Sequence, residues 1–291
     1  MKVHPDRYRV PPGRKVNLRH WATDTRRLYK SDDDYRDLLV ADVRKLSALQ
    51  QLLYASGTYS LLLIFQAMDA AGKDGAISHV MSGVNPEGCD VHSFKAPSAE
   101  EAAHDFLWRT TCRLPVRGHI GIFNRSYYEE VLVVRVHPDL LRNAGLPPPL
   151  MRDPDLWEGR YRSIADFERH LHRNGTRVIK FFLHLSKAEQ RKRFLERIDE
   201  PDNNWKFSAA DMKERGRWAD YTRVYEAAIG ATSTKASPWY IVPADDKLNA
   251  RLIVSRVVID ALKDLDLHYP VVTKERRKEL HAIRRQLRGK G

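Results

Sequence analysis

The sequence predicts an α/β fold in which five strands form a parallel sheet with helices on both faces. Short apolar runs, each fitting a strand buried on both faces, alternate with helical patterns five times along the chain. The first run, Leu61 to Phe65, is followed by a small-residue turn, Lys73 and a helix start at Gly75. Strand, tight turn, lysine and helix are typical of a phosphate-binding loop, whose backbone N–H groups face an anion.

The other elements follow from periodicity and from capping residues. Apolar residues at three- and four-residue steps predict a first helix that packs on the sheet. Ser98 and Glu101 form a capping box, and Ser186 caps a very basic helix. The expected strands are 61–65, 89–95, 118–123, 177–185 and 238–242, and the expected helices are 34–55, 76–84, 98–113, 156–173, 186–197 and 249–265, with a helix or tight turn at 127–134 and a loop at 143–156.

The chain divides into three expected parts. Residues 1–34 are a basic N-terminal arm, 35–272 are the folded domain, and 273–291 are a basic helical tail that we expect to project. Within the domain, the segment 200–237 is rich in charge and aromatic rings and precedes the last strand. Kinases carry there a lid that brings cations to phosphates and excludes water. The alternative is a solvated helical hairpin whose Trp residues belong to the core.

Composition excludes several classes of protein. A hydrophobic content of 42% supports a sizeable core, and no apolar run approaches the ~18–20 residues that span a bilayer. The start of the sequence has no apolar segment typical of a secretory signal. Cys89 and Cys112 have no CxxC spacing, which excludes a disulfide framework and a cysteine-based zinc site. We therefore expect a cytoplasmic protein without a membrane partner.

The net charge of +12 indicates an anionic partner. Nucleic acid, a phosphorylated metabolite, polyphosphate and an acidic membrane all meet that requirement. A surface charge that serves only solubility is the alternative. Charge alone does not choose among them.

The loop departs from the usual pattern G-x-x-x-x-G-K-[ST]. Ala67 replaces the first glycine, and Asp74 stands where a hydroxyl residue normally contacts magnesium. A further carboxylate, Asp69, lies inside the loop and would be repelled by phosphates unless a divalent cation lay between them, so we interpret it as a metal ligand. The alternative is an ordinary strand-turn-helix without a ligand. The residues expected to contact phosphate here are Ala70, Ala71, Gly72, Lys73, Asp74 and Gly75.

A second candidate position is the end of the third strand, where Asn124 and Arg125 follow one another. Parallel strands place their carboxyl ends at one edge, near the phosphate loop. Arg125 has the planar fork that clamps a transferring phosphoryl group. Asn124 lies where a second metal carboxylate often occurs and is expected to bind a metal-bound water or a phosphate. The alternative for Arg125 is pairing with Glu129 or Glu130.

Further candidates lie near the second strand and in the segment 200–237. Lys95 ends that strand and Asn85 precedes it, and each either contacts substrate or is a solvated residue. The basic and aromatic residues of the lid-like segment are Trp205, Lys206, Lys213, Arg215, Arg217, Trp218, Arg223 and Lys235.

Five stretches of the chain closely resemble the polyphosphate kinase 2 family. They are FQAMDAAGKDG, HVMSGVNPEGC, FNRSYYEEVLVVRVHP, RFLERIDEPDNNWKFSAAD and PWYIVPADDK, in register from about 35 to 265. The resemblance implies a three-layer P-loop kinase fold, similar to thymidylate kinase, with a helical lid. It also implies reversible transfer of the terminal phosphoryl group of inorganic polyphosphate to a nucleotide, with Mg²⁺ or Mn²⁺ as the cofactor.

The same resemblance assigns roles to single residues. The family's loop Asp and Lys match Asp69 and Lys73, and its strand-end pair, often written Asp-Arg, matches Asn124 and Arg125. Its lid motif matches Trp205-Lys206 and the later Asp220. The form FNRSYYEE resembles the class III subgroup, which accepts both AMP and ADP. Losing a negative charge at position 124 is our hypothesis for that relaxed choice of acceptor.

The sequence therefore predicts a polyphosphate-dependent kinase that converts AMP and/or ADP to ADP and ATP. Adenine nucleotides are the expected acceptors, guanine nucleotides are a further option, and the family implies a homodimer or homotetramer. One alternative is an ATP-dependent nucleoside monophosphate kinase on the same fold. The other is a basic nucleic-acid-binding protein with a vestigial loop, for which Asp69 and the lid-like segment would have no purpose.

Overall fold

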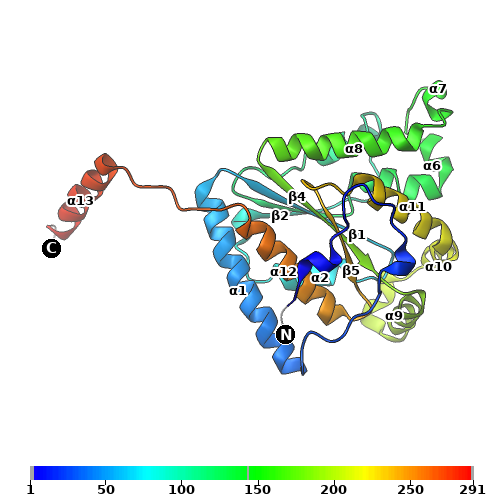
Figure 1. Ribbon diagram of the computed structural model, residues 1–291, viewed down its shortest axis with the longest axis horizontal. Coiled ribbons are helices and arrows are strands. Elements are labelled where there is room, and N and C mark those ends of the chain that lie inside the picture. The colour runs from blue at the N-terminus through cyan, green and yellow to red at the C-terminus, as the bar shows by residue number, and fades with distance from the viewer. Residues whose placement is uncertain (1–2, 143, 290–291) are drawn as a thin grey trace.

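The chain forms one parallel sheet of five strands in the order β2-β3-β1-β4-β5 (Figure 1). The computed structural model describes residues 3–142 and 144–289, except for the side chains of Asn203 and Lys206. The strands are β1 Ser60–Ala67, β2 Cys89–Ser93, β3 Ile120–Asn124, β4 Thr176–His184 and β5 Trp239–Pro243. The predicted α/β class and the five-stranded parallel sheet are confirmed.

Helices surround the sheet and the loops that follow it. The α-helices are α1 Asp32–Ser56, α2 Lys73–Val80, α3 Ala99–Ala102, α4 Trp108–Thr111, α5 Val133–Val136, α6 Pro138–Arg142, α7 Pro148–Met151, α8 Leu156–Arg173, α9 Lys187–Asp199, α10 Ala209–Gly216, α11 Trp218–Thr232, α12 Lys247–Lys263 and α13 Lys274–Arg288. The short 3-10 helices are η1 Pro5–Tyr8, η2 Leu18–His20, η3 Pro86–Gly88, η4 Tyr127–Glu130 and η5 Pro201–Lys206.

Two hydrophobic cores lie on opposite faces of the sheet, which makes three layers. Along β1, Leu61, Leu63 and Phe65 belong to the core under α1, α2 and α12. Leu62 and Ile64 belong to the core under α8 and α11. Successive side chains of a strand point to opposite faces, so a strand covered on both sides needs a continuous apolar run. That requirement explains the run that the sequence shows.

The strand order places β1 in the middle of the sheet. On one side of β1 lie β3 and then β2, and on the other side lie β4 and then β5; the chain runs from β1 out to β2, back to β3, and then across β1 to β4 and β5. The direction of winding therefore reverses at the carboxyl end of β1, where open parallel sheets bind ligands. The phosphate loop directly follows β1 at that point.

Several boundaries differ from those predicted. The helix expected over 98–113 is two short helices, because the Asp105 carboxylate accepts a hydrogen bond from the Leu107 amide at 2.9 Å and begins a new turn. The capping box of Ser98 and Glu101 is confirmed. Helix α2 begins at Lys73 rather than after Gly75, so the lysine lies in its first turn.

The segment 200–237 forms η5, α10 and α11. Helix α10 buries no residue, and Trp205 in η5 is 79% exposed. In contrast, Val224, Tyr225 and Ile229 of α11 are buried in the second core. The C-terminal half of this segment is therefore part of the body of the domain.

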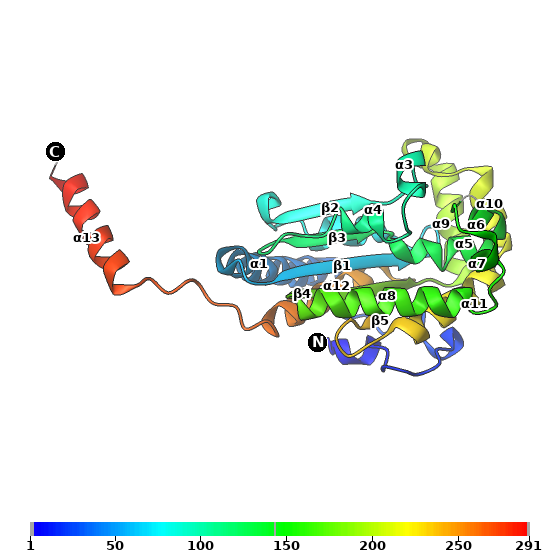
Figure 2. The same ribbon diagram turned by 90° about the horizontal axis from the view of Figure 1, so that it is seen from above.

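The two ends of the chain behave differently. The N-terminal arm lies along the edge of the sheet, where the Val10 amide donates to Trp239 O at 2.9 Å and both Val10 and Leu18 are buried. The tail helix α13 buries no residue and projects from the molecule (Figures 1 and 2). Among the described residues, no helix is long and apolar enough to cross a bilayer.

Candidate functional site

The backbone of the phosphate loop is held in an unusual conformation. Ala70 has a φ of 64° and Gly72 a φ of 95°, both in the left-handed region. Arg125, at the end of β3, has a φ of 65°, and its amide donates to Phe65 O at 3.0 Å. A side chain makes this region costly, and non-glycine residues held there occur preferentially at functional sites. Two such residues therefore mark the carboxyl ends of β1 and β3.

Helix α9 fixes the loop from the opposite side. The guanidinium of Arg193, which is buried, donates to Ala70 O at 2.9 Å and to Ala244 O at 2.6 Å. Gln190, one turn earlier, donates to Asp69 O at 3.0 Å. The loop carbonyls are thus turned toward α9. The charge-assisted bonds of Arg193 bind the loop to the start of the segment after β5.

Lys73 lies in the first turn of α2, with its ammonium 3.4 Å from Ala67 O. Burial and the nearby Arg125 guanidinium lower the pKa of Lys73, although Asp69 and Glu129 oppose that shift. A cation whose charged form is disfavoured gains from an anion that enters the site. The positive charge of Lys73 is therefore not fully compensated by the protein, and a bound phosphate would stabilise it.

Asp69 and Arg125 face one another across the loop. The guanidinium of Arg125 lies 3.8 Å from the Asp69 carboxylate, and their side chains remain 45% and 35% exposed. Glu129 also acts on Arg125, and burial raises the pKa of Glu129. Arg125 thus has carboxylates on two sides, as the alternative of local pairing expected, but it keeps a solvent-facing side.

Asn124 does not point into open space. Its amide Nδ2 donates to the Asp74 carboxylate at 2.5 Å, which joins the end of β3 to the first turn of α2. Asp74 occupies the place of the usual hydroxyl residue and is exposed. Asp74 and Asn124, the two residues that differ from the common motifs, are therefore in direct contact.

Two cavities meet at the Asp69–Arg125 pair. The first, which we call the loop cavity, has a volume of about 800 Å³ and is lined by the loop, Lys95, Asn124 and residues of α9 and α12. Its lining includes seven Lys or Arg side chains and five Asp or Glu side chains. Burial and Arg193 lower the pKa of Lys247 in this lining, so positive charges are crowded here as they are around Lys73.

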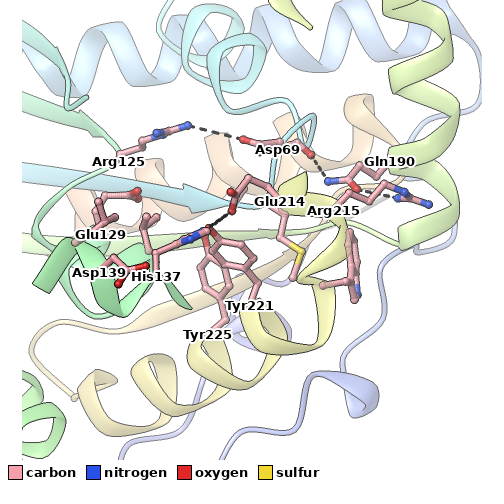
Figure 3. Close-up of a pocket in the computed structure, with 15 residues that line it drawn as sticks. Asp69, Arg125, Glu129, His137, Asp139, Gln190, Glu214, Arg215, Tyr221 and Tyr225 are labelled. Atoms are coloured by element: carbon pink, nitrogen blue, oxygen red, sulfur yellow. Dashed lines mark hydrogen bonds and ion pairs between the residues drawn. The ribbon is translucent and has the colours of Figure 1, made fainter. Parts of the chain in front are cut away.

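The second, which we call the aromatic cavity, has a volume of about 430 Å³ (Figure 3). Trp218, Tyr221 and Tyr225 of α11 line one side of it. Glu214 accepts hydrogen bonds from Tyr221 Oη at 2.6 Å and pairs with His137 Nε2 at 2.9 Å. Despite its partial burial, these two bonds lower the pKa of Glu214, which holds it as a carboxylate.

Most of the residues predicted from the sequence come together. Those that line the loop cavity are Asp69, Ala70, Ala71, Gly72, Lys73, Asp74, Gly75, Lys95, Asn124 and Arg125. Asp69 and Arg125 line the aromatic cavity as well.

Three of the predicted residues, Asn85, Arg217 and Asp220, are not brought to this site. Asn85 caps η3 at the amino end of β2, the end of the sheet away from the loop. Arg217 donates to Val136 O at 3.3 Å, and Asp220 pairs with Arg223; neither lines the two cavities. The Lys206 side chain lies outside the described residues.

The residues that hold the loop and form the aromatic cavity were not predicted from the sequence. Gln190 and Arg193 are three positions apart on a basic helix and so share one face, which was the available signal. Tyr221 and Tyr225 are four positions apart on α11, but only the tertiary structure places that face opposite Asp69.

The donor set fits a magnesium ion that arrives with the substrate. Among the described residues there is no group of three or more His, Cys, Asp or Glu side chains able to hold a metal alone. Mg²⁺ at phosphotransfer sites typically takes one or two carboxylates together with substrate phosphates and water. Asp69, partly exposed and shared by the two cavities, provides such a carboxylate.

A central strand followed by a phosphate loop, with cations and a carboxylate at its end, defines a P-loop phosphotransferase. Comparison with known proteins narrows this class. The family model described as polyphosphate kinase 2 (PPK2) matches residues 29–270. The chain belongs to the polyphosphate kinase 2 family.

Relatives of known name cover almost the whole chain. An ADP-polyphosphate phosphotransferase of Rhodopseudomonas palustris is 59% identical over 287 residues, 99% of each chain. An AMP/ADP-polyphosphate phosphotransferase of Meiothermus ruber is 42% identical over 265 residues, 91% of this chain and 95% of the relative. The crystal structure of polyphosphate kinase 2 from Arthrobacter aurescens superimposes with a TM-score of 0.85 at 38% identity and covers 96% of both chains.

Proposed function

We propose that this protein transfers the terminal phosphoryl group of inorganic polyphosphate to ADP and so forms ATP, with AMP as a second acceptor. Family membership supports polyphosphate as the donor. The relative that is 59% identical is named for ADP, and the one that is 42% identical is named for AMP and ADP. The AMP-and-ADP subgroup expected from the sequence thus has support at the lower identity, and ADP has support at the higher one.

The observation that carries this proposal is the sharing of Asp69 and Arg125 by two unlike cavities. The loop cavity, with cations and backbone N–H groups, suits a long polyanion. The aromatic cavity, with Tyr and Trp rings and the Glu214 carboxylate, suits a base and a sugar. Donor and acceptor would then meet at Asp69 and Arg125. We therefore assign the loop to polyphosphate and the aromatic cavity to the nucleotide.

In the proposed reaction a β-phosphate oxygen of ADP attacks the terminal phosphorus of polyphosphate. The bond from that phosphorus to the bridging oxygen breaks, and the shortened chain leaves with the electron pair. A terminal phosphate has its second pKa near ~6, so the nucleophile is already ionised and needs no base. Arg125 and Lys73 would neutralise charge on the transferring group, which is the main requirement of phosphoryl transfer.

Magnesium would be held by Asp69 together with substrate phosphates, and Mn²⁺ would take the same place. When bound, the ion supplies charge neutralisation between the two phosphate chains. Helices η5 and α10 would form the moving part of the lid, because α11 is anchored in the core. The expected homodimer or homotetramer stays a prediction, which light scattering of the purified protein tests.

The direct test is an assay without ATP. Purified protein, Mg²⁺ and long-chain polyphosphate are incubated with ADP or with AMP, and nucleotides are separated by chromatography. We expect ATP from ADP, and slower formation of ADP from AMP. If ADP forms from AMP only when ATP replaces polyphosphate, the protein is an ATP-dependent monophosphate kinase and the proposal is wrong.

A further inference from the structure

A third cavity lies at the end of the molecule opposite the catalytic site. It has a volume of about 700 Å³ and is lined by residues that precede β1, β3 and β4, at the amino ends of these strands. Its basic residues are Arg117, His172, Arg173 and Arg177, and Asp264 is the one acidic residue in its lining. We call it the arginine hollow.

The arginines of this hollow form no ion pair within the part of the chain that the structure describes. Among the described residues, the guanidinium groups of Arg117, Arg173 and Arg177 make no ion pair and no side-chain hydrogen bond. Burial and the charge of Arg177 lower the pKa of His172, so a further positive charge is disfavoured in this lining. Uncompensated guanidinium groups gathered in one concave site attract a polyanion.

A second basic element follows the hollow along the chain. Helix α12 ends at Lys263, beside the hollow, and the chain continues from there to α13. Helix α13 has seven Lys or Arg residues and two Glu residues in 15, a net charge of +5. Figure 2 shows α13 projecting away from the end of the molecule that carries α9 and α10.

We infer that the arginine hollow and α13 form a second binding site for long-chain polyphosphate, separate from the catalytic site. The inference rests on the proposed use of polyphosphate as donor. The two sites are separated by at least the length of β1, eight residues or about 26 Å at 3.3 Å per residue. A long chain reaches both sites on one molecule or on two neighbouring copies, and triphosphate reaches only one.

The occupant is identified by the chemistry of the lining. A nucleic acid bound as a single strand uses aromatic rings on which its bases stack. The hollow contains one Tyr, one His and no Phe or Trp among its arginines. Polyphosphate needs only cations along its chain. Retention at a second site keeps the donor close between turnovers, which lowers its KM without a new catalytic contact.

The test compares two charge-matched variants of the full chain. Arg117→Gln/Arg173→Gln removes two exposed cations from the hollow, and Arg36→Gln/Arg44→Gln removes two exposed cations from α1. Initial rates are measured with long-chain polyphosphate and with triphosphate as donor. We expect the hollow variant to raise the KM for the long chain about fivefold and to leave that for triphosphate unchanged, while the α1 variant changes neither.

Binding provides a readout that does not require turnover. Fluorescently labelled long-chain polyphosphate is titrated into each protein at several salt concentrations. The hollow variant should bind more weakly, and its salt dependence should be reduced by about one per lost phosphate contact. Arg284→Gln/Arg285→Gln in α13 should shift binding in the same direction. Absence of turnover in the wild type would remove the proposed function, and this titration would still decide the second site.

Three results would overturn the inference. The first is equal long-chain binding by the two charge-matched variants. The second is an equal loss of rate with triphosphate and with the long chain, because the hollow would then act on the catalytic site. The third is tighter binding of a single-stranded oligonucleotide than of polyphosphate at equal charge, with that binding lost in the hollow variant.

Discussion

The amide of Asn124 donates to the carboxylate of Asp74 at 2.5 Å, so the end of β3 is bonded directly to the first turn of α2. Lys73 precedes Asp74 and Arg125 follows Asn124, which means that this bond sets the spacing of two candidate phosphate-binding cations. An amide is suited to this contact, because it can donate to a carboxylate, whereas an ionised aspartate cannot.

The first prediction concerns Asn124→Asp. The change places two carboxylates in contact and removes the donor, so the pair repels and the spacing of the cations changes. We expect the ratio of kcat/KM for AMP to that for ADP to change by about fivefold or more, equivalent to about 1 kcal/mol of differential transition-state binding. Initial rates with each acceptor at saturating polyphosphate measure it. An unchanged ratio would mean that the residue at position 124 does not determine the choice between AMP and ADP.

The second prediction concerns the loop lysine. Lys73→Met keeps an unbranched chain one atom shorter and removes its charge, and we expect kcat/KM to fall by about 10²–10³, as when one preorganised transition-state contact is lost. Lys95→Met is the matched control, because Lys95 lines the same cavity but is exposed. Its expected loss is below about tenfold. Comparable losses of kcat/KM in both variants would mean that the total positive charge of the cavity, and not the position of Lys73, accelerates the reaction.

The same variant predicts an opposite effect on stability. The pKa of Lys73 is lowered in the folded protein, mainly by burial. Below that lowered pKa the charged lysine costs stability, and as the pH rises from there toward 10.5, the ordinary pKa of lysine, the cost disappears. Lys73→Met should therefore melt at a higher temperature than wild type at pH 7, with the gap narrowing as the pH rises. Calorimetry from pH 7 to about 10 measures this, and a gap that widens would contradict it.

The sequence predicts what depends on local chain chemistry. The run Leu61 to Phe65 has to be continuous because both faces of β1 are covered. The loop directly follows this run, so the sequence predicts the strand and the loop together. Ser186, which caps α9 by accepting from the Glu189 amide at 3.1 Å, is similarly a local signal. In contrast, nothing local distinguishes Asp105, whose carboxylate begins the turn that divides the helix expected over 98–113.

What could not be predicted depends on residues distant in sequence. Arg193 binds the loop carbonyl of Ala70, and the sequence separates them by 123 positions. Tyr225 appears on α11 as one more apolar position, and only the packing of α11 on the second core turns it toward Asp69. Asn85 was chosen for its nearness to a strand. It lies at the amino end of β2, whereas the phosphate loop and the loop cavity lie at the carboxyl ends of the strands.

A buried ion pair below the site gives a prediction about stability. Lys180 and Glu168 are fully buried and paired, and Glu168 also accepts from Tyr127 Oη at 2.9 Å and Tyr128 Oη at 2.8 Å. Lys180→Met leaves the carboxylate unpaired, which should cost about 3–5 kcal/mol of unfolding free energy.

The double variant Lys180→Met/Glu168→Gln supplies the control for that prediction. It removes both charges and keeps an acceptor for the two tyrosines, so most of the lost stability should return. Urea denaturation of the two single variants and the double variant measures the coupling. If the double variant is as unstable as the sum of the singles, the pair contributes through packing and not through charge.

The last prediction tests whether α9 positions the loop. Arg193 is buried and uses its whole guanidinium, donating to Ala70 O, Ala244 O and Asp245 O and pairing with Glu189 at 2.9 Å. A lysine carries the same charge but one ammonium, which cannot reach acceptors on opposite sides. Arg193→Lys should therefore leave Ala70 without its donor and let the loop shift. A displacement near 1 Å costs about 10²-fold in kcat.

The matched control for this change is Arg191→Lys, two positions earlier on the same helix, where the side chain is exposed. It should keep wild-type kcat, because an exposed arginine on this surface loses little when it becomes lysine. Arg193→Lys should also lower kcat more than it raises the KM for polyphosphate, since the loop cations remain but are misaligned. A rise in KM alone would mean that Arg193 binds the donor directly, and equal rates in both variants would leave the loop conformation independent of α9.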